Sequence, residues 1–239
     1  MKPEGIINNQ AQGLLSDERP CLAVMLKYPD PGKVKTRLGR EIGMEAAALL
    51  YSCFVLRLLG QCRNTGYEIM LCCHPDRDIS HYQAWLGQGY IYTVQAGGDL
   101  GRKMLWCFEQ AFEHGFTFPV LMGSDIPGLD RRLILRALEE PGSRHSVIGP
   151  SSDGGYYLIG VDRRSFRPDF FSTIPWSTSG VLDMTMKKFA SAGLEPLVLP
   201  VLRDVDTLDD LKHVFSGLGL PATPDELPAS IERYCRIME

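Results

Sequence analysis

Short apolar segments alternate with amphipathic segments along most of this chain, and that alternation limits the fold more than any other feature. The apolar segments 22–26, 67–73 and 119–122 have the length of buried strands. Between them, segments 45–59 and 99–112 carry apolar residues at helical spacing. This alternation predicts an α/β fold with a mostly parallel central sheet and helices on both faces.

The expected helices have defined apolar faces, and further elements follow the same pattern. In segment 45–59 the face comprises Leu49, Leu50, Cys53, Leu56 and Gly60. In segment 99–112 it comprises Leu100, Met104, Cys107, Phe108 and Ala111. Further strands are predicted at 90–94, 146–148, 156–161 and 196–199, and further helices at 81–86, 129–139, 182–190, 206–215 and 229–236.

The 239 residues suit one domain, because no internal repeat or convincing linker divides them. Residues 1–19 are mostly polar and lack the apolar centre of a signal peptide. We therefore expect a flexible leader before a single domain at 20–239. The tail 217–239 packs either on this domain or on the partner in a homodimer. Its apolar residues are Leu218, Leu220, Ile231 and Tyr234.

Composition argues against several classes of partner. The net charge is −4 and no run of Lys or Arg reaches five residues, so binding to nucleic acid or to acidic membranes is not predicted. No apolar stretch approaches the roughly 18 residues of a membrane-spanning helix.

The cysteines indicate a reducing compartment. There are seven of them, an odd number, and none forms a C-x-x-C pair, which argues against a zinc site or a disulfide framework. Most lie in apolar segments, where cysteine behaves as a small buried hydrophobe. We therefore predict a cytoplasmic protein. The adjacent Cys72 and Cys73 form either a redox pair or, as we favour, successive strand residues on opposite faces.

Polar segments follow several predicted strands, at the edge where parallel sheets place their binding sites. The first begins at Lys27 and then carries Gly32, Lys33, Lys35 and Arg37. Backbone amides and cations at a strand-to-helix junction suit phosphate. The spacing is not that of a Walker A loop, and a solvated basic loop is the alternative.

Asp125 directly follows the apolar segment 119–122, between Ser124 and the sequence Ile126-Pro127. A carboxylate at the end of a buried strand is costly unless it is paired, hydrogen-bonded or bound to a metal. Alternatively, Asp125 merely caps the turn that follows.

Another polar segment, Asp153-Gly154-Gly155-Tyr156, lies between two predicted strands. Its glycine pair permits a ligand to approach the backbone closely. An ordinary tight hairpin is the alternative interpretation.

Asp204 and Asp206 point the same way if their segment is extended. Either Asp206 or Thr207 caps the helix that follows, with Asp210 as the acidic residue of its first turn. Because one cap uses one carboxylate, Asp125 with Asp204 or Asp206 is a candidate site for Mg²⁺ or Mn²⁺. Such a metal would neutralise and orient a diphosphate leaving group.

These segments, in this order, resemble a bacterial family of nucleotide-diphospho-sugar transferase-like proteins. Its members are mostly named glycosyltransferases without an established substrate. The layout is also similar to the nucleotidyltransferases that make molybdopterin dinucleotide or activate phospholactate. The resemblance spans about residues 22 to 211, and segment 153–157 is its most specific part. It is carried by Lys27, Pro29, 32–38, Gln95, 98–104, 123–127, Gly149, Pro150, 153–160, 176–179, 204–207 and 209–211.

The resemblance implies a Rossmann-like glycosyltransferase-A fold, with a nucleotide across the first strand ends and Asp125 at the position of the metal-binding Asp-x-Asp motif. The chain has no second Asp two residues from Asp125, so Asp204 or Asp206 is expected to complete the metal site. The expected nucleotide or phosphate ligands are Lys27, Gly32, Lys33, Lys35, Arg37, Arg102 and Ser124. The expected substrate ligands are Gly154, Gly155, Tyr156, Trp176 and Ser177.

Three functions follow, in order of preference. In a glycosyltransferase, a nucleotide-diphosphate sugar would react with an unknown acceptor, with Asp125 and Asp153 as catalytic residues. Asp125 would hold the metal, and Asp153 would orient the substrate or act as the base. A nucleotidyltransferase would instead release pyrophosphate from a nucleoside triphosphate, but the first loop lacks the Gly-rich turn typical of sugar-nucleotide pyrophosphorylases. The third alternative is a non-catalytic nucleotide-binding module.

Overall fold

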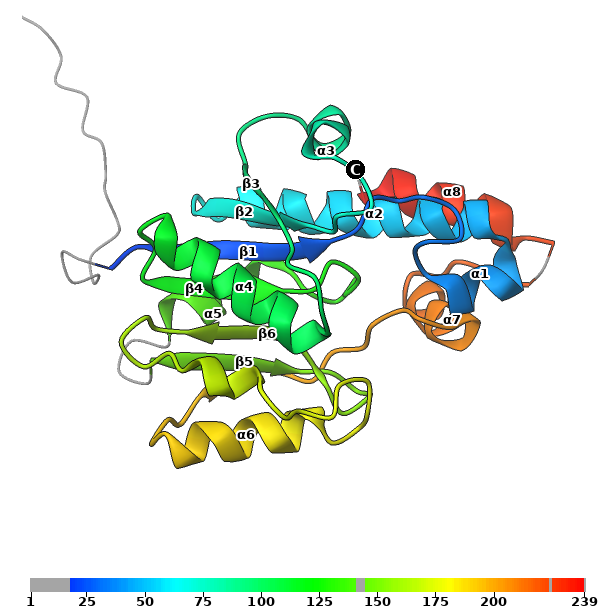
Figure 1. The fold of residues 1–239 in the computed structure, drawn as a ribbon. Coiled ribbons are helices and arrows are strands. Elements are labelled where there is room, and N and C mark those ends of the chain that lie inside the picture. Colours follow the sequence, from blue (N-terminus) through cyan, green and yellow to red (C-terminus); the bar gives the residue numbers. More distant parts are fainter. Residues whose placement is uncertain (1–17, 141–144, 224, 239) are drawn as a thin grey trace, which may run out of the picture.

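In the computed structural model, which describes residues 18–140, 145–223 and 225–238, seven strands form one sheet (Figure 1). The strands are β1 (Pro20–Leu26), β2 (Glu68–Cys73), β3 (Ile91–Val94), β4 (Phe118–Met122), β5 (Ser146–Pro150), β6 (Tyr156–Val161) and β7 (Leu197–Val198). The helices are α1 (Thr36–Ile42), α2 (Met44–Arg63), α3 (Ile79–Leu86), α4 (Leu100–Glu113), α5 (Arg131–Glu139), η1 (Pro168–Phe171), α6 (Val181–Ser191), α7 (Leu208–Gly217) and α8 (Leu227–Met238). The predicted α/β fold is confirmed.

The strand order is β3-β2-β1-β4-β6-β5-β7, and the paired strands are parallel except where β6 meets β4 and β5. Only residues 151–155 connect β5 to β6, which is too short for the crossover that parallel strands require. Because β1 and β4 are adjacent and parallel, the chain leaves both at the same edge of the sheet. The predicted polar segments after these two strands are therefore neighbours.

Helices cover both faces of the sheet (Figure 1). On one face α2, α3 and α5 pack against Leu22 and Val24, whereas on the other α4, η1 and α6 pack against Cys21 and Ala23. The alternation along β1 follows from the two-residue period of a strand. Cys73 and Cys72 are likewise divided between the two faces, so their interpretation as successive strand residues is confirmed.

The buried face of α2 differs from the predicted one. Leu50 and Cys53 are buried, but Leu49 and Leu56 are 48% and 43% exposed. The helix contributes to two core clusters, one against the sheet and one against α8, so its buried residues do not form the single stripe assumed from the sequence. Leu100, at the start of α4, is also exposed, although the rest of its predicted face is buried.

By length and composition alone, α2 is the one described helix that is long and apolar enough to cross a membrane. This differs from the expectation that no stretch comes close to that length. However, 56% of its apolar window is buried inside the protein, as in a core helix.

The C-terminal helices α7 and α8 pack against α1 and α2 beyond the end of β1 (Figure 1). Leu220, Ile231 and Tyr234 are buried there, so the tail packs on its own domain, and Leu218 stays exposed. At the start of α7, Thr207 Oγ1 accepts the N–H of Asp210, and Asp210 accepts the N–H of Thr207 at 2.9 Å. Thr207 is therefore the cap, which leaves Asp206 available to the site.

Cys53 of α2 and Cys235 of α8 form a disulfide, so the expectation of unpaired cysteines is wrong for these two. They are 182 residues apart in the sequence, and the packing of α8 on α2 brings their Cα atoms to 5.4 Å. The other five cysteines are buried free thiols. Because disulfides are rare in a reducing cytoplasm, the cytoplasmic location stays a prediction.

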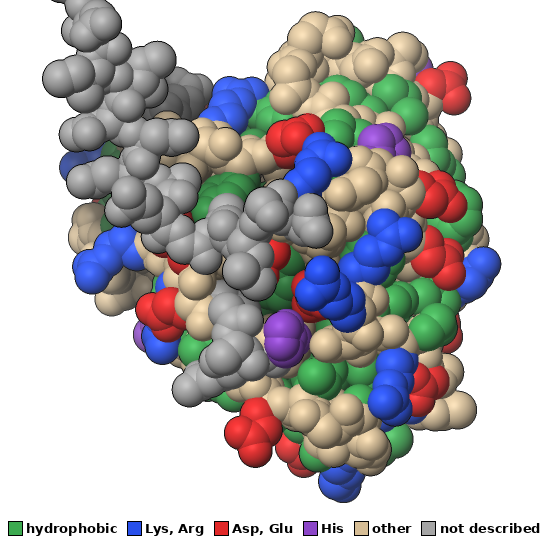
Figure 2. Space-filling view, turned by 90° about the vertical axis from the view of Figure 1, so that its left-hand side faces the viewer, with side chains coloured by type: hydrophobic (Ala, Val, Ile, Leu, Met, Phe, Trp, Pro, Cys, Tyr) green, Lys and Arg blue, Asp and Glu red, His purple; other side chains and the backbone are tan. Residues whose placement is uncertain are grey.

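The sequence predicts a leader up to residue 19 and a domain that begins at residue 20. Residues 1–17 of the expected leader lie outside the described residues. Arg19 already contacts the fold, because its backbone N–H donates to Thr117 Oγ1 at 2.8 Å. Figure 2 shows the face at the N-terminal end of β1, where basic and acidic side chains are interspersed over the described residues.

Candidate functional site

A cavity of about 680 Å³ opens at the carboxyl ends of β1 and β4. Its wall combines the loop after β1, the segment after β4, the β5–β6 turn, the start of α4 and the segment before α7. The predicted site residues that line it are Lys27, Lys33, Lys35, Arg37, Ser124, Asp125, Asp153, Gly155, Tyr156, Trp176, Ser177, Asp204 and Asp206. Segments distant in the sequence thus form one site.

The loop after β1 turns at Gly32, whose φ of 76° suits a residue without a Cβ. The backbone N–H of Lys33 donates to the carbonyl of Asp30 at 3.0 Å and closes the turn. Lys35 then adopts a left-handed conformation, with φ of 46°, at the N-cap of α1. As a result Lys33, Lys35 and Arg37 line the cavity, whereas Gly32 shapes the loop without lining it.

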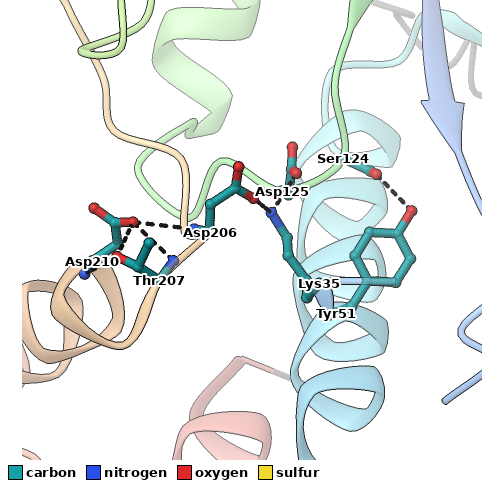
Figure 3. Close-up of polar contacts among 7 residues, drawn as sticks. All are labelled: Lys35, Tyr51, Ser124, Asp125, Asp206, Thr207 and Asp210. Atoms are coloured by element: carbon teal, nitrogen blue, oxygen red, sulfur yellow. Dashed lines mark hydrogen bonds and ion pairs between the residues drawn. The ribbon is translucent and has the colours of Figure 1, made fainter. Parts of the chain in front are cut away.

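The ammonium group of Lys35 lies between two carboxylates (Figure 3). Its Nζ is 2.5 Å from Oδ2 of Asp125 and 2.7 Å from Oδ1 of Asp206. The Lys35 side chain is only 4% exposed. Burial by itself lowers the pKa of Lys35, but the charges of Asp125 and Asp206 and their hydrogen bonds outweigh burial and raise it. Lys35 is therefore a permanent cation among the carboxylates.

Tyr51 holds the segment that carries Asp125. Its hydroxyl lies 2.9 Å from Oγ of Ser124 (Figure 3). The same hydroxyl accepts the backbone N–H of Lys27 at 2.9 Å. One side chain of α2 thus joins the ends of β1 and β4. Burial raises the pKa of Tyr51 to about 12, so the hydroxyl is neutral at physiological pH.

The turn between β5 and β6 fixes Asp153. Its Oδ1 accepts hydrogen bonds from the Ser151 hydroxyl and from the backbone N–H of Gly155, the latter at 2.9 Å. Gly154 has φ of 89°, and a Cβ there would lie 2.3 Å from the carbonyl oxygen of Ser179. Gly154 thus packs against the chain before α6 and does not line the cavity, contrary to its predicted role in substrate binding.

Asp204 and Asp206 both line the cavity, as their alternation predicts. The pKa of Asp204 is raised to about 6, first by burial and then by the negative charges of Asp206, Asp153 and Asp125. The neighbouring carboxylates therefore act on Asp204 even though Lys35 lies beside two of them.

The three predicted metal ligands do not form a ready-made divalent site. Asp125 and Asp206 direct oxygens at Lys35, and no group of three His, Cys, Asp or Glu side chains among the described residues is arranged to hold a metal ion. Mg²⁺ requires near-octahedral oxygen ligands. The expected Mg²⁺ or Mn²⁺ therefore does not fit this arrangement while Lys35 occupies it.

Arg102 is the third predicted residue that does not line the cavity. It is exposed on α4, and its backbone N–H donates to the capping side chain of Asp99 at 2.9 Å. The next residue, Lys103, lines the cavity with Leu100 and Met104. Positions 100, 103 and 104 share one face of a helix, and this spacing was the signal available in the sequence. Other lining residues that were not predicted include Tyr51, His74, Gln95 and Ser151.

One part of the cavity wall is aromatic. The rings of Tyr156 and Trp176 meet edge to face, with centroids 6.5 Å apart. Trp176 approaches α4 closely, because a Cβ at Gly101 would lie 2.6 Å from its Nε1. Aromatic walls beside charged groups are typical of sites for small organic ligands.

The chain has a glycosyltransferase-A-like fold, which transferases of nucleotide sugars and of nucleotides share. Residues 58–178, just over half of the chain, match the family described as uncharacterized protein conserved in bacteria, DUF2064. The chain belongs to that family. No curated protein matches it significantly.

A crystal structure from Desulfovibrio desulfuricans G20, of a protein provisionally named a nucleotide-diphospho-sugar transferase, is similar throughout. It is 36% identical, with a TM-score of 0.83 over 92% of this chain and 98% of that one.

More distant structures share only the fold. Rv0371c from Mycobacterium tuberculosis H37Rv, solved as a complex with manganese, is 16% identical, with a TM-score of 0.53 over 84% of this chain and 100% of that one. The 4-diphosphocytidyl-2C-methyl-D-erythritol synthase from Anaerococcus prevotii DSM 20548 is 12% identical, with a TM-score of 0.53 over 84% and 99% of the two chains.

Proposed function

We propose that this protein is a glycosyltransferase that uses a nucleotide-diphosphate sugar as donor. The observation that carries the proposal is the single cavity in which cations of the first loop face the carboxylates of three other segments. Lys33, Arg37 and Lys103 supply positive charge for the diphosphate. The relative with 36% identity carries a name that agrees with this donor class.

In the proposed reaction, an acceptor hydroxyl attacks the anomeric carbon of the sugar. The bond from that carbon to the diphosphate oxygen breaks, and the nucleoside diphosphate leaves with the electron pair. Asp153 accepts the hydroxyl proton. Its Oδ1 is held by Ser151 and by the Gly155 N–H, and its Oδ2 is assigned to the acceptor.

Assistance by Mg²⁺ or Mn²⁺ was expected, but the proposed reaction has no step that requires a metal. Lys35 already contacts the facing oxygens of Asp125 and Asp206. Asp125 therefore acts by positioning Lys35, rather than as the metal ligand that the sequence suggested.

The test is release of nucleoside diphosphate from a panel of nucleotide sugars incubated with simple sugar or alcohol acceptors. Asp153→Asn should lower turnover by about 100-fold or more, because it removes the base. Asp183→Asn, an exposed carboxylate of α6, is the matched control and should leave turnover unchanged. Full activity in Asp153→Asn would contradict the assigned base.

The alternative is a nucleotidyltransferase, which is favoured by the fold shared with the 4-diphosphocytidyl-2C-methyl-D-erythritol synthase. The loop after β1 argues against it, because Lys27-Tyr28-Pro29 replaces a glycine-rich turn. Incubation with nucleoside triphosphates and sugar phosphates distinguishes the two functions, since only the alternative releases pyrophosphate. Nucleotide binding without any turnover would indicate a non-catalytic module instead.

A further inference from the structure

Three unfavourable contributions to the free energy oppose the position of Lys35. Its left-handed backbone is uncommon for a residue with a Cβ. Lys35 is the N-cap residue of α1, and the helix dipole disfavours a positive charge at this end of a helix. Its side chain is almost fully buried, which is costly for an ammonium group. The contacts with Asp125 and Asp206 must offset all three.

Those contacts use one carboxylate oxygen from each of the two segments that a bridging metal would join. Lys35 Nζ meets Oδ2 of Asp125 at 2.5 Å and Oδ1 of Asp206 at 2.7 Å, and the two carboxylates come from segments after β4 and before α7 (Figure 3). A divalent ion that joined these segments through the same two oxygens would have to displace the ammonium group. The lysine thus performs the joining role that a metal performs between distant carboxylates.

The ammonium group also retains a capacity for ligand. It carries three N–H donors, of which these contacts account for two. Lys35 lines the cavity alongside Lys33 and Arg37, the cations assigned to the diphosphate. A phosphate oxygen is the anionic acceptor that suits the third donor.

We propose that Lys35 is the resident cation of this site, and that the nucleotide diphosphate binds on it without a divalent metal. The choice of ligand rests on the proposed function, but the exclusion of the metal by Lys35 does not. Removal of the lysine charge should expose Asp125 and Asp206, with Asp204 nearby, and convert the site into one that binds a divalent cation.

The first arm of the test measures Mn²⁺ binding by electron paramagnetic resonance. Lys35→Met should bind Mn²⁺ at least tenfold more tightly than the wild type, and Mn²⁺ should raise the melting temperature of that variant only. Lys33→Met is the matched control, since it removes one positive charge from the same loop without freeing either carboxylate. Equal Mn²⁺ affinity in the wild type and Lys35→Met would overturn the proposal.

The second arm measures binding of the adenosine, guanosine, cytidine and uridine diphosphates to the wild type, by calorimetry, in EDTA and then in Mn²⁺. We expect at least one to bind in EDTA, with less than a threefold gain from Mn²⁺. Binding that requires Mn²⁺ would overturn the proposal. If no nucleotide binds in either condition, the proposed function fails, and the first arm still decides the role of Lys35.

Circular dichroism checks that Lys35→Met is folded. If that variant does not fold, the wild type decides the question. Tight Mn²⁺ binding to wild-type protein would then overturn the proposal, and weak binding with nucleotide bound in EDTA would support it.

Discussion

The hydroxyl of Tyr51 lies 2.9 Å from the Oγ of Ser124, so a residue of α2 fixes the residue directly before Asp125. The same hydroxyl accepts the backbone N–H of Lys27 at 2.9 Å. One buried side chain therefore sets the distance between the cationic loop after β1 and the carboxylate after β4.

We expect Tyr51→Phe to destabilise the protein by about 1 kcal/mol, because the buried Ser124 hydroxyl and the backbone N–H of Lys27 each lose a partner while the ring stays in place. Urea denaturation measures this loss. Tyr28→Phe removes the hydroxyl of the residue next to Lys27 but leaves both contacts intact, so it serves as the control. Equal effects of the two variants would show that the Tyr51 hydroxyl has no special role.

Substitutions of Asp206 and Asp210 should have different effects on stability and on nucleotide binding, although the two residues are close in the sequence. Asp210→Ala breaks the capping box of α7 and should lower the free energy of unfolding by about 1 kcal/mol. Asp206→Asn leaves that box intact, but removes one of the two charges that hold Lys35. It should weaken nucleotide binding in calorimetry by about tenfold, equivalent to roughly 1.4 kcal/mol. Loss of binding in Asp210→Ala alone would contradict this division.

The disulfide between Cys53 and Cys235 predicts a specific thiol count. Denatured protein without reductant should give five reactive thiols, matching the five free cysteines, and reduction should add two. Cys235→Ser should lower the free energy of unfolding by about 2–4 kcal/mol, because the unfolded chain is no longer constrained. Cys107→Ser tests another buried cysteine that forms no disulfide, and it should leave the count of added thiols at two.

The raised pKa of Asp204 predicts a pH dependence of stability with a defined sign. The folded state holds the proton up to about pH 6, whereas the ordinary pKa is 3.8, so protonation favours folding. The stabilisation is fully present below pH 3.8 and is lost as the pH rises through about 6. Because the side chain is partly exposed, we expect a discounted effect of about 1 kcal/mol.

Urea denaturation at pH 4 and pH 7 measures this effect. Asp204→Asn should be about 1 kcal/mol more stable than the wild type at pH 7, and the gain should largely vanish at pH 4, where the wild-type carboxyl is protonated. An equal difference at both values of pH would show that the charge of Asp204 is not what destabilises the folded state.

The sequence by itself determined the strands, most of the helices, and the edge of the sheet at which the site lies. These features depend on local periodicity and on the rule that parallel sheets bind ligands at their carboxyl ends. Asp125, Asp153, Asp204 and Asp206 were found in this way, as were Lys33, Lys35 and Arg37.

Only the tertiary structure decided which of these groups meet. Lys35 is 90 residues from Asp125 and 171 residues from Asp206, and no periodicity in the sequence relates such distant positions. The same holds for the disulfide and for the buried faces of α2, because they depend on α8 packing against it. The sequence predicted the carboxylates of Asp125 and Asp206 as ligands for a metal, but the fold places the ammonium group of Lys35 between them.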